Sequence, residues 1–125
     1  MNLDMKVLIV DDFATMRRIV RNVLKQVGFK NMIEADNGKA ALKALKKENV
    51  DLILSDWNMP EMPGIDLLKA IKSDDELKNI PFVMVTAEAQ KDNIIEAVKG
   101  GVSSYIVKPF TAETVKEKLS AIFKK

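Results

Sequence analysis

The sequence predicts an α/β fold in which five parallel strands alternate with five helices. Five short runs are apolar almost without interruption, which is typical of strands that are covered on both faces. Between these runs, apolar residues recur at spacings of three and four, the period of an amphipathic helix. This alternation favours an open, doubly wound sheet with right-handed crossovers and helices on both faces.

The predicted strands are rich in valine and isoleucine and are bounded by polar or turn residues. In chain order they are MKVLIV at 5–10, NMIEA at 31–35, DLILS at 51–55, PFVMVT at 81–86 and SSYIVK at 103–108. The second run is a weaker strand candidate.

The predicted helices follow from apolar stripes and end signals. Gly28 and Gly100-Gly101 are expected to end helices, whereas Asp36-Asn37-Gly38 can start the second helix and Thr111 is expected to cap the fifth. We interpret the stripes as core. Their residues are Ile19, Val20, Val23, Leu24 and Val27; Ala41, Leu42 and Leu45; Ile65, Leu68 and Ile71; Ile94, Ile95 and Val98; and Val115, Leu119, Ile122 and Phe123.

Composition predicts one globular domain over residues 1–125, with 47% hydrophobic and 30% charged residues. A net charge of +2 implies no nucleic-acid partner, and we interpret the basic cluster Arg17, Arg18 and Arg21 as a solvated helix face. The apolar runs are too short to span a bilayer, and the start lacks a signal peptide's apolar stretch. We therefore expect a cytoplasmic protein without membrane contact, which the absence of cysteine fits.

Histidine is absent from the sequence. Serine–histidine and cysteine–histidine catalysis and imidazole-ligated metals are therefore excluded. Any chemistry has to use carboxylates, amines, hydroxyls or a bound ion.

Polar groups follow the predicted strands where each strand ends. Asp11 and Asp12 follow the first strand, Asp56 the third, Thr86 ends the fourth and Lys108 the fifth. Ligands of open parallel sheets bind beyond the carboxyl ends of the strands. In the strand order 2-1-3-4-5, which we adopt from known flavodoxin-like proteins rather than work out from the sequence, these four strands are neighbours.

Three converging carboxylates repel one another, and a small oxygen-ligated cation such as Mg²⁺ relieves the repulsion. Asp11 or Asp12 could instead cap the first helix; we favour Asp12 as the nearer ligand. Lys108 is expected either to pair with Asp56 or to hold an incoming anion, and the following Pro109 permits a cis peptide. The set favours phosphoryl transfer onto Asp56, from a donor that is another molecule.

Four motifs together resemble the receiver domain of two-component response regulators: VLIVDD, ILSDWNMPEMPG, VMVTAEA and YIVKPF. The resemblance covers the whole chain and leaves nothing for an output domain. The stretch VDDFATMRRIVRNVLKQVGF is closer still to the stand-alone chemotaxis members of that family.

The resemblance implies a role for each matching residue. Asp56 would accept the phosphoryl group, and Thr86 and Lys108 would hold it. Mg²⁺ would be bound by Asp12, Asp56 and the Asn58 backbone carbonyl, with Asp11 acting through the outer shell or water. Thr86 and Tyr105 would form a switch pair, and Asn58 and Glu88 would tune hydrolysis of the phosphate. From the residues alone, Tyr105 is a half-buried strand aromatic with a solvated hydroxyl.

The resemblance also implies the biology. The protein would be a monomer that phosphorylates and dephosphorylates itself with Mg²⁺ and has no external substrate. A chemotaxis histidine kinase would be the phosphoryl donor and the flagellar motor switch would be the target. A dedicated phosphatase is a further expected partner. The alternative is a phosphate sink or a non-motor signalling adaptor. The expected partner surface is the fourth helix, fifth strand and fifth helix, with Ala89, Lys91, Ile94, Tyr105, Val107 and Lys118.

Two positions depart from the family pattern. Pro63 stands where aspartate or asparagine is usual, so a stiffer loop is expected, with Gly64 still making the turn. Gln90 stands where relatives often carry lysine.

Three other classes of protein fit the sequence less well. A flavin carrier is disfavoured because the acidic DDFATM loop would repel a flavin phosphate, and a phosphohydrolase acting on external substrates would need a lid. A receiver that only scaffolds partners would not need the complete set of acids, threonine and lysine.

Overall fold

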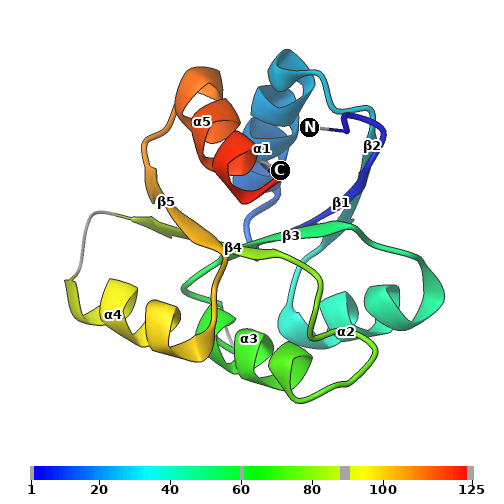
Figure 1. The fold of residues 1–125 in the computed structure, drawn as a ribbon, viewed down its shortest axis with the longest axis vertical. Helices are drawn as coiled ribbons and strands as arrows, with labels where there is room; N and C mark the ends of the chain where they lie inside the picture. The colour runs from blue at the N-terminus through cyan, green and yellow to red at the C-terminus, as the bar shows by residue number, and fades with distance from the viewer. Residues whose placement is uncertain (1, 60, 88–90, 124–125) are drawn as a thin grey trace.

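The computed structural model describes residues 2–59, 61–87 and 91–123, without the side chains of residues 87 and 91–94. Strands and helices alternate along the chain (Figure 1). The strands are β1 (Lys6–Val10), β2 (Asn31–Ala35), β3 (Leu52–Asp56), β4 (Phe82–Ala87) and β5 (Ser104–Lys108). The helices are α1 (Ala14–Val27), α2 (Gly38–Lys47), α3 (Gly64–Lys72), α4 (Lys91–Gly100) and α5 (Ala112–Ile122). All ten predicted elements are present.

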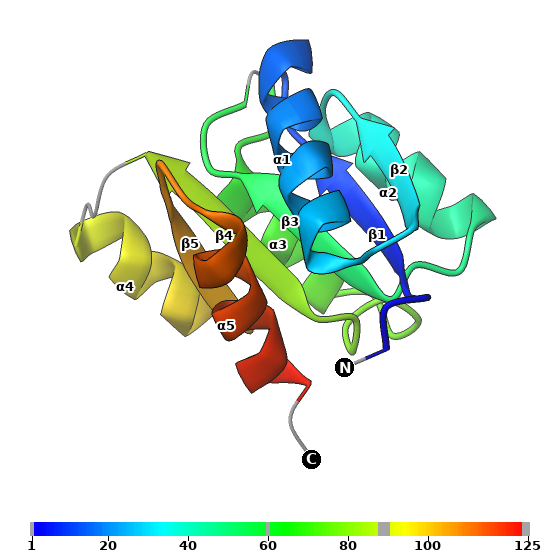
Figure 2. The same ribbon diagram turned by 90° about the horizontal axis from the view of Figure 1, so that it is seen from above.

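The five strands form one parallel sheet in the order β2-β1-β3-β4-β5. Figure 2 shows this order across the sheet, with α1 and α5 lying over one face. The predicted flavodoxin-like fold and strand order are confirmed. Because all strands run the same way, the carboxyl ends of β1, β3, β4 and β5 lie side by side at one edge.

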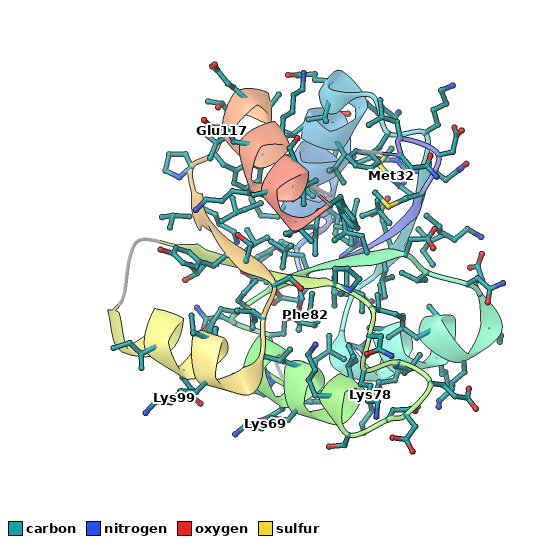
Figure 3. The ribbon with its side chains drawn as sticks, in the orientation of Figure 1. Met32, Lys69, Lys78, Phe82, Lys99 and Glu117 are labelled. Carbon is teal, nitrogen blue, oxygen red and sulfur yellow. The ribbon has the colours of Figure 1, made fainter. Side chains whose placement is uncertain are left out.

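Helices cover both faces of the sheet, α1 and α5 on one and α2, α3 and α4 on the other (Figure 1). Side chains alternate between the two cores: Val7 and Ile9 pack with the first pair of helices, Leu8 and Val10 with the other three. Figure 3 shows side chains filling both layers, with Phe82 near the centre. Within the described chain, no helix is long and apolar enough to span a bilayer.

The predicted helix ends are confirmed where their geometry is described. Gly28 ends α1 with φ 122°, a conformation that favours glycine, and its N–H donates to the Leu24 and Lys25 carbonyls. The Asn37 side chain accepts the Ala40 N–H at the start of α2, and the Thr111 hydroxyl accepts the Thr114 N–H at the start of α5.

Three residues that we expected in the core are exposed instead. Ile19 on α1 is 43% exposed, and Ile95 and Val98 on α4 are 51% and 59% exposed. Among the α4 side chains that the structure describes, from Ile95 onward, Ala97 is the buried one, and Gly100 lies directly against Leu68 of α3. Small residues let the two helices approach closely, so α4 packs through them and turns the larger residues outward. The Ile94 side chain lies outside the described residues.

The loop after β3 differs from our expectation. Gly64 does not supply the turn: the described non-glycine residue with positive φ is Glu61, at 66°, and Gly64 begins α3. Its N–H donates to the Trp57 carbonyl at 2.8 Å. Pro63 fits as the residue before the helix, and its carbonyl accepts the Asp66 and Leu67 N–H groups.

Gly64 is needed because the backbone of Asp56 lies against it. A Cβ at position 64 would clash with the Asp56 carbonyl oxygen and lie 2.9 Å from Met84 Sδ and 3.2 Å from Trp57 Cα. Gly64→Ala should therefore lower the free energy of unfolding by about 1–3 kcal/mol, the usual cost of overpacking. Urea denaturation followed by circular dichroism measures this.

Gly100→Ala is the matched control. Its added methyl group would crowd only the end of the Leu68 side chain within 3.0 Å, and alanine gains about 1 kcal/mol of helix propensity over glycine. Gly100→Ala should therefore lower the free energy of unfolding clearly less than Gly64→Ala does. If Gly64→Ala lowers the free energy of unfolding no more than Gly100→Ala does, the contact with the Asp56 backbone adds no extra cost and the prediction is wrong.

Candidate functional site: an acidic cluster at the strand ends

Three carboxylates converge at the carboxyl ends of β1 and β3. One oxygen from each of Asp11, Asp12 and Asp56 lies within 4.8 Å of the others. Asp11 and Asp56 are only 3% and 7% exposed, because helices cover both faces of the strands that carry them. The cluster thus brings together the acids that the sequence placed at this edge.

Lys108, at the end of β5, meets these acids. Its Nζ donates to Asp56 Oδ1 at 2.8 Å and lies 3.7 Å from Asp11 Oδ2. The Lys108–Pro109 peptide is cis. The expected ion pair between Lys108 and Asp56 is therefore present, and it compensates the buried Asp56 carboxylate.

The loop after β1 holds Asp11 in place. Asp11 Oδ1 accepts the Phe13 N–H at 2.9 Å, and the Asp11 carbonyl accepts a hydrogen bond from Arg17 Nη1 at 2.7 Å. The residue before α1 is Phe13, so neither acid occupies the N-cap position. Arg17 is also ion-paired with Glu34, and it is not the solvated side chain that we expected.

Burial raises the pKa of Asp11 above its ordinary value of 3.8. The hydrogen bond from Phe13 opposes this, the negative charges of Asp56 and Asp12 add to it, and the Lys108 ammonium lowers the Asp11 pKa. The cluster is therefore an electrostatically unfavourable place for a further negative charge.

Asp12 Oδ1 is buried, and it has no hydrogen-bond partner among the residues that the structure describes. Such an atom is rare in native proteins, and a bound ion is one of the arrangements that explain it. Asp12 also lines a cavity of about 300 Å³ with Phe13, Asn58, Met59 and Pro63. An oxygen-rich donor set with one unsatisfied carboxylate oxygen fits a hard divalent cation such as Mg²⁺.

Thr86 is buried at the end of β4, where it pairs in register with Val107. Alternation along β4 puts Thr86 on the same face as Met84, whose register partner is Tyr105. Tyr105 is partly buried against the core under α3 and α4. The Lys118 ammonium of α5 lies 4.8 Å from the centre of the Tyr105 ring, a cation–π distance.

Some predicted residues cannot be placed. Glu88, Ala89 and Gln90 lie outside the described residues, as do the side chains of Lys91 and Ile94. Asn58 is exposed on the rim of the cavity, and Val107 is partly exposed on β5. Sequence reasoning missed the contact of Arg17 with the site and the exposure of Ile95 and Val98 on α4. The small residues Ala97 and Gly100 in the same helix could have indicated that Ile95 and Val98 are exposed.

Comparison with known proteins agrees with this geometry. Residues 7–120 match the model of the response regulator receiver domain. The chain is 59% identical to chemotaxis protein CheY-3 of Vibrio cholerae over 125 residues, which is all of this chain and 96% of that protein. It is 56% identical to chemotaxis protein CheY of Pseudomonas aeruginosa over 121 residues, 97% of this chain and 98% of that protein.

A solved structure gives the same result at the level of the fold. The chemotaxis response regulator CheY4 of Vibrio cholerae superposes with a TM-score of 0.86 at 33% sequence identity, covering 96% of this chain and 99% of that one. A shared fold alone does not fix function, but here the fold, the sequence identity and the strand-end acids agree. The chain belongs to the response regulator receiver domain family.

Proposed function

We propose that this protein is a single-domain response regulator, which accepts a phosphoryl group on Asp56 from a chemotaxis histidine kinase and then binds the flagellar motor switch. The observation that carries the proposal is the buried Asp56 carboxylate, 2.8 Å from the Lys108 ammonium and beside two further acids. The chemotaxis assignment is supported by the 56–59% identity to proteins of that name.

In the proposed reaction, an Asp56 carboxylate oxygen attacks the phosphorus of the donor in line. A new oxygen–phosphorus bond forms and the phosphorus–nitrogen bond of a phosphohistidine breaks, with its electron pair going to the imidazole of the kinase. Lys108 exchanges its contact with Asp56 Oδ1 for one with a phosphoryl oxygen. The chain lacks histidine, so the donor has to be another molecule.

Asp12, Asp56 and the Asn58 backbone carbonyl would hold Mg²⁺, with Asp11 acting through water. The unpartnered Asp12 Oδ1 supports this assignment. When bound, the ion would offset the negative charge that gathers as phosphate meets carboxylate. The protein's own contribution is to hold these oxygens and Lys108 in position before the donor arrives.

The proposed switch links Thr86 to Tyr105. Thr86 would donate its hydroxyl to the new phosphoryl group, and Tyr105 would turn inward behind it. Their shared face of the sheet and the partly buried position of Tyr105 support this coupling. Both conformations should exist before phosphorylation, which adds about −1.5 to −2 charge and shifts their populations.

The proposed output surface consists of α4, β5 and α5, with Ala89, Lys91, Ile94, Tyr105, Val107 and Lys118. The exposed Ile95 and Val98 on α4 support it, because they lie one helical turn apart and present apolar surface to solvent. We add both residues to the surface. A partner that binds only the switched form of this face would read the phosphorylation state.

The protein would have no external substrate. Its reactions would be Mg²⁺-dependent self-phosphorylation and autodephosphorylation, with Asn58 and Glu88 tuning the second. We place it in the cytoplasm as a monomer, without nucleic-acid or membrane partners, and a dedicated phosphatase is compatible with the site. The alternative is a phosphate sink or a non-motor adaptor, which would carry the same site and lack motor binding.

Asp56→Asn should abolish acid-labile phosphate incorporation from acetyl phosphate with Mg²⁺, because the amide is not a nucleophile for phosphorus. Labelling with radioactive phosphate measures this. Asp66→Asn on the outer part of α3 removes the same charge and should label normally. Undiminished labelling of the Asp56 variant would place the acceptor elsewhere.

Mg²⁺ should quench the fluorescence of Trp57, which is the only tryptophan and follows Asp56 directly. Asp12→Asn should weaken the apparent affinity at least about tenfold, since it removes the ligand with the unsatisfied oxygen. Asp66→Asn again serves as the charge control. An unchanged signal, together with no heat of binding in calorimetry, would remove the metal site from the proposal.

Binding to an immobilised flagellar switch protein from the same organism should rise about tenfold with Mg²⁺ and beryllofluoride, a phosphoryl mimic. Ile95→Ser should lose most of that gain, whereas Ile19→Ser, an exposed isoleucine on α1, should keep it. Absence of beryllofluoride-dependent binding in the unchanged protein would favour the phosphate sink or adaptor.

A further inference from the structure

Arg17 connects the first helix to the loop that carries the acids. Its Nη1 donates to the Asp11 carbonyl at 2.7 Å, and its Nε donates to Glu34 Oε1 on β2 at 3.0 Å. Arg21, one turn further along α1, also pairs with Glu34. The Arg17 side chain is only 18% exposed.

The Asp11 carbonyl lies where the sheet no longer supplies a partner. The Asp11 N–H still donates to the Ala35 carbonyl at 3.2 Å, but the last register pairs of β1 are those of Val10. A carbonyl on a residue this buried needs a donor, and Arg17 provides it. A hydrogen bond from a charged donor is stronger than one between neutral groups.

This carbonyl belongs to the same rigid peptide unit as the nitrogen and Cα of Asp12, because the peptide bond is planar. Fixing the Asp11 oxygen therefore fixes the orientation of the unit from which the Asp12 side chain starts. The other side of the loop is fixed by the bond from the Phe13 N–H to Asp11 Oδ1. Asp12 is thus oriented from its backbone, while its own Oδ1 has no partner among the described residues.

The guanidinium is itself held in place. Its donors have a fixed planar arrangement, so anchoring Nε on Glu34 determines the direction in which Nη1 points. The hydrogen bonds from Arg21 and Arg17 lower the pKa of Glu34 below its ordinary value of 4.5. Glu34 is therefore ionised at neutral pH and keeps Arg17 anchored.

We propose that Arg17 is a positioning residue for the metal site, which holds the peptide between Asp11 and Asp12 so that Asp12 presents Oδ1 to the cation. This inference rests on the proposed function. The competing view is a plain ion pair that fastens α1 to β2, of the kind that contributes little at a surface. That view predicts a loss of stability without a selective loss of Mg²⁺ affinity.

Four variants separate these views. Arg17→Met removes both contacts, and Arg17→Lys can reach one of the two acceptors at a time. Arg21→Met loosens the same Glu34 pairing but leaves the Asp11 carbonyl bound. Arg18→Met removes the same charge from the same helix. Calorimetry gives the Mg²⁺ dissociation constant, and the amide signal of Asp12 in a ¹H–¹⁵N spectrum reports on the peptide that Arg17 contacts.

We expect Arg17→Met to weaken Mg²⁺ binding about tenfold, the lower range for loss of a group that orients a metal ligand. Arg17→Lys should lie between that variant and the unchanged protein. Arg21→Met and Arg18→Met should bind within about twofold of normal. The Asp12 amide signal should shift in the two Arg17 variants and stay in place in the other two.

Equal weakening in Arg17→Met and Arg21→Met would overturn the inference, because general loosening of α1 would then explain it. Normal affinity in Arg17→Met would overturn it as well. If Arg17→Met does not fold, Arg17→Lys against Arg21→Met decides by the same criteria. Failure of the unchanged protein to bind Mg²⁺ would instead refute the proposed function, and this inference with it.

Discussion

Three carboxylates crowd together at the ends of two strands, and the rest of the site has to compensate their negative charge. Asp11, Asp12 and Asp56 approach within 4.8 Å where helices on both faces exclude much of the water. Lys108 contacts two of them and leaves the third with an unsatisfied oxygen. A single ammonium cannot neutralise three ionised acids, which is why we propose that a further cation binds here. The same ammonium is also the group that an incoming phosphoryl oxygen would attract.

The fold assembles this site from segments that are far apart in the sequence. The order β2-β1-β3-β4-β5 puts the ends of β1 and β3 side by side and brings β4 and β5 next to them. The helices then refine the positions. Gly64 lets α3 begin against the Asp56 backbone, and Arg17 on α1 binds the carbonyl at the end of β1. The backbone at both strand ends is therefore contacted from both helical layers.

The gathering of polar groups at the strand ends could be predicted from the sequence, since parallel strands bring their carboxyl ends to one edge and the residues there are carboxylates, a hydroxyl and an amine. Asp56 and Lys108 are the clearest case. The contacts of Arg17 could not be predicted, because one acceptor is a backbone carbonyl, which carries no sequence signal, and the other, Glu34, lies on β2. The prediction that Ile95 and Val98 of α4 lie in the core was wrong for a different reason. Helical spacing marks an apolar stripe, but it does not say whether large or small residues face the sheet.

We propose that Asp11, Asp12 and Asp56 form a cation site and that Asp56, within that site, accepts the phosphoryl group. Crystals soaked in Mn²⁺, an oxygen-ligated substitute for Mg²⁺ with a strong anomalous signal, test it most directly. We expect one anomalous peak between the carboxylates of Asp12 and Asp56, with ligand distances of about 2.0–2.3 Å. The proposed cation site would be contradicted by the absence of a peak between Asp12 and Asp56 together with a peak elsewhere on the surface. The acidic run Asp74, Asp75 and Glu76 is an example of such a place.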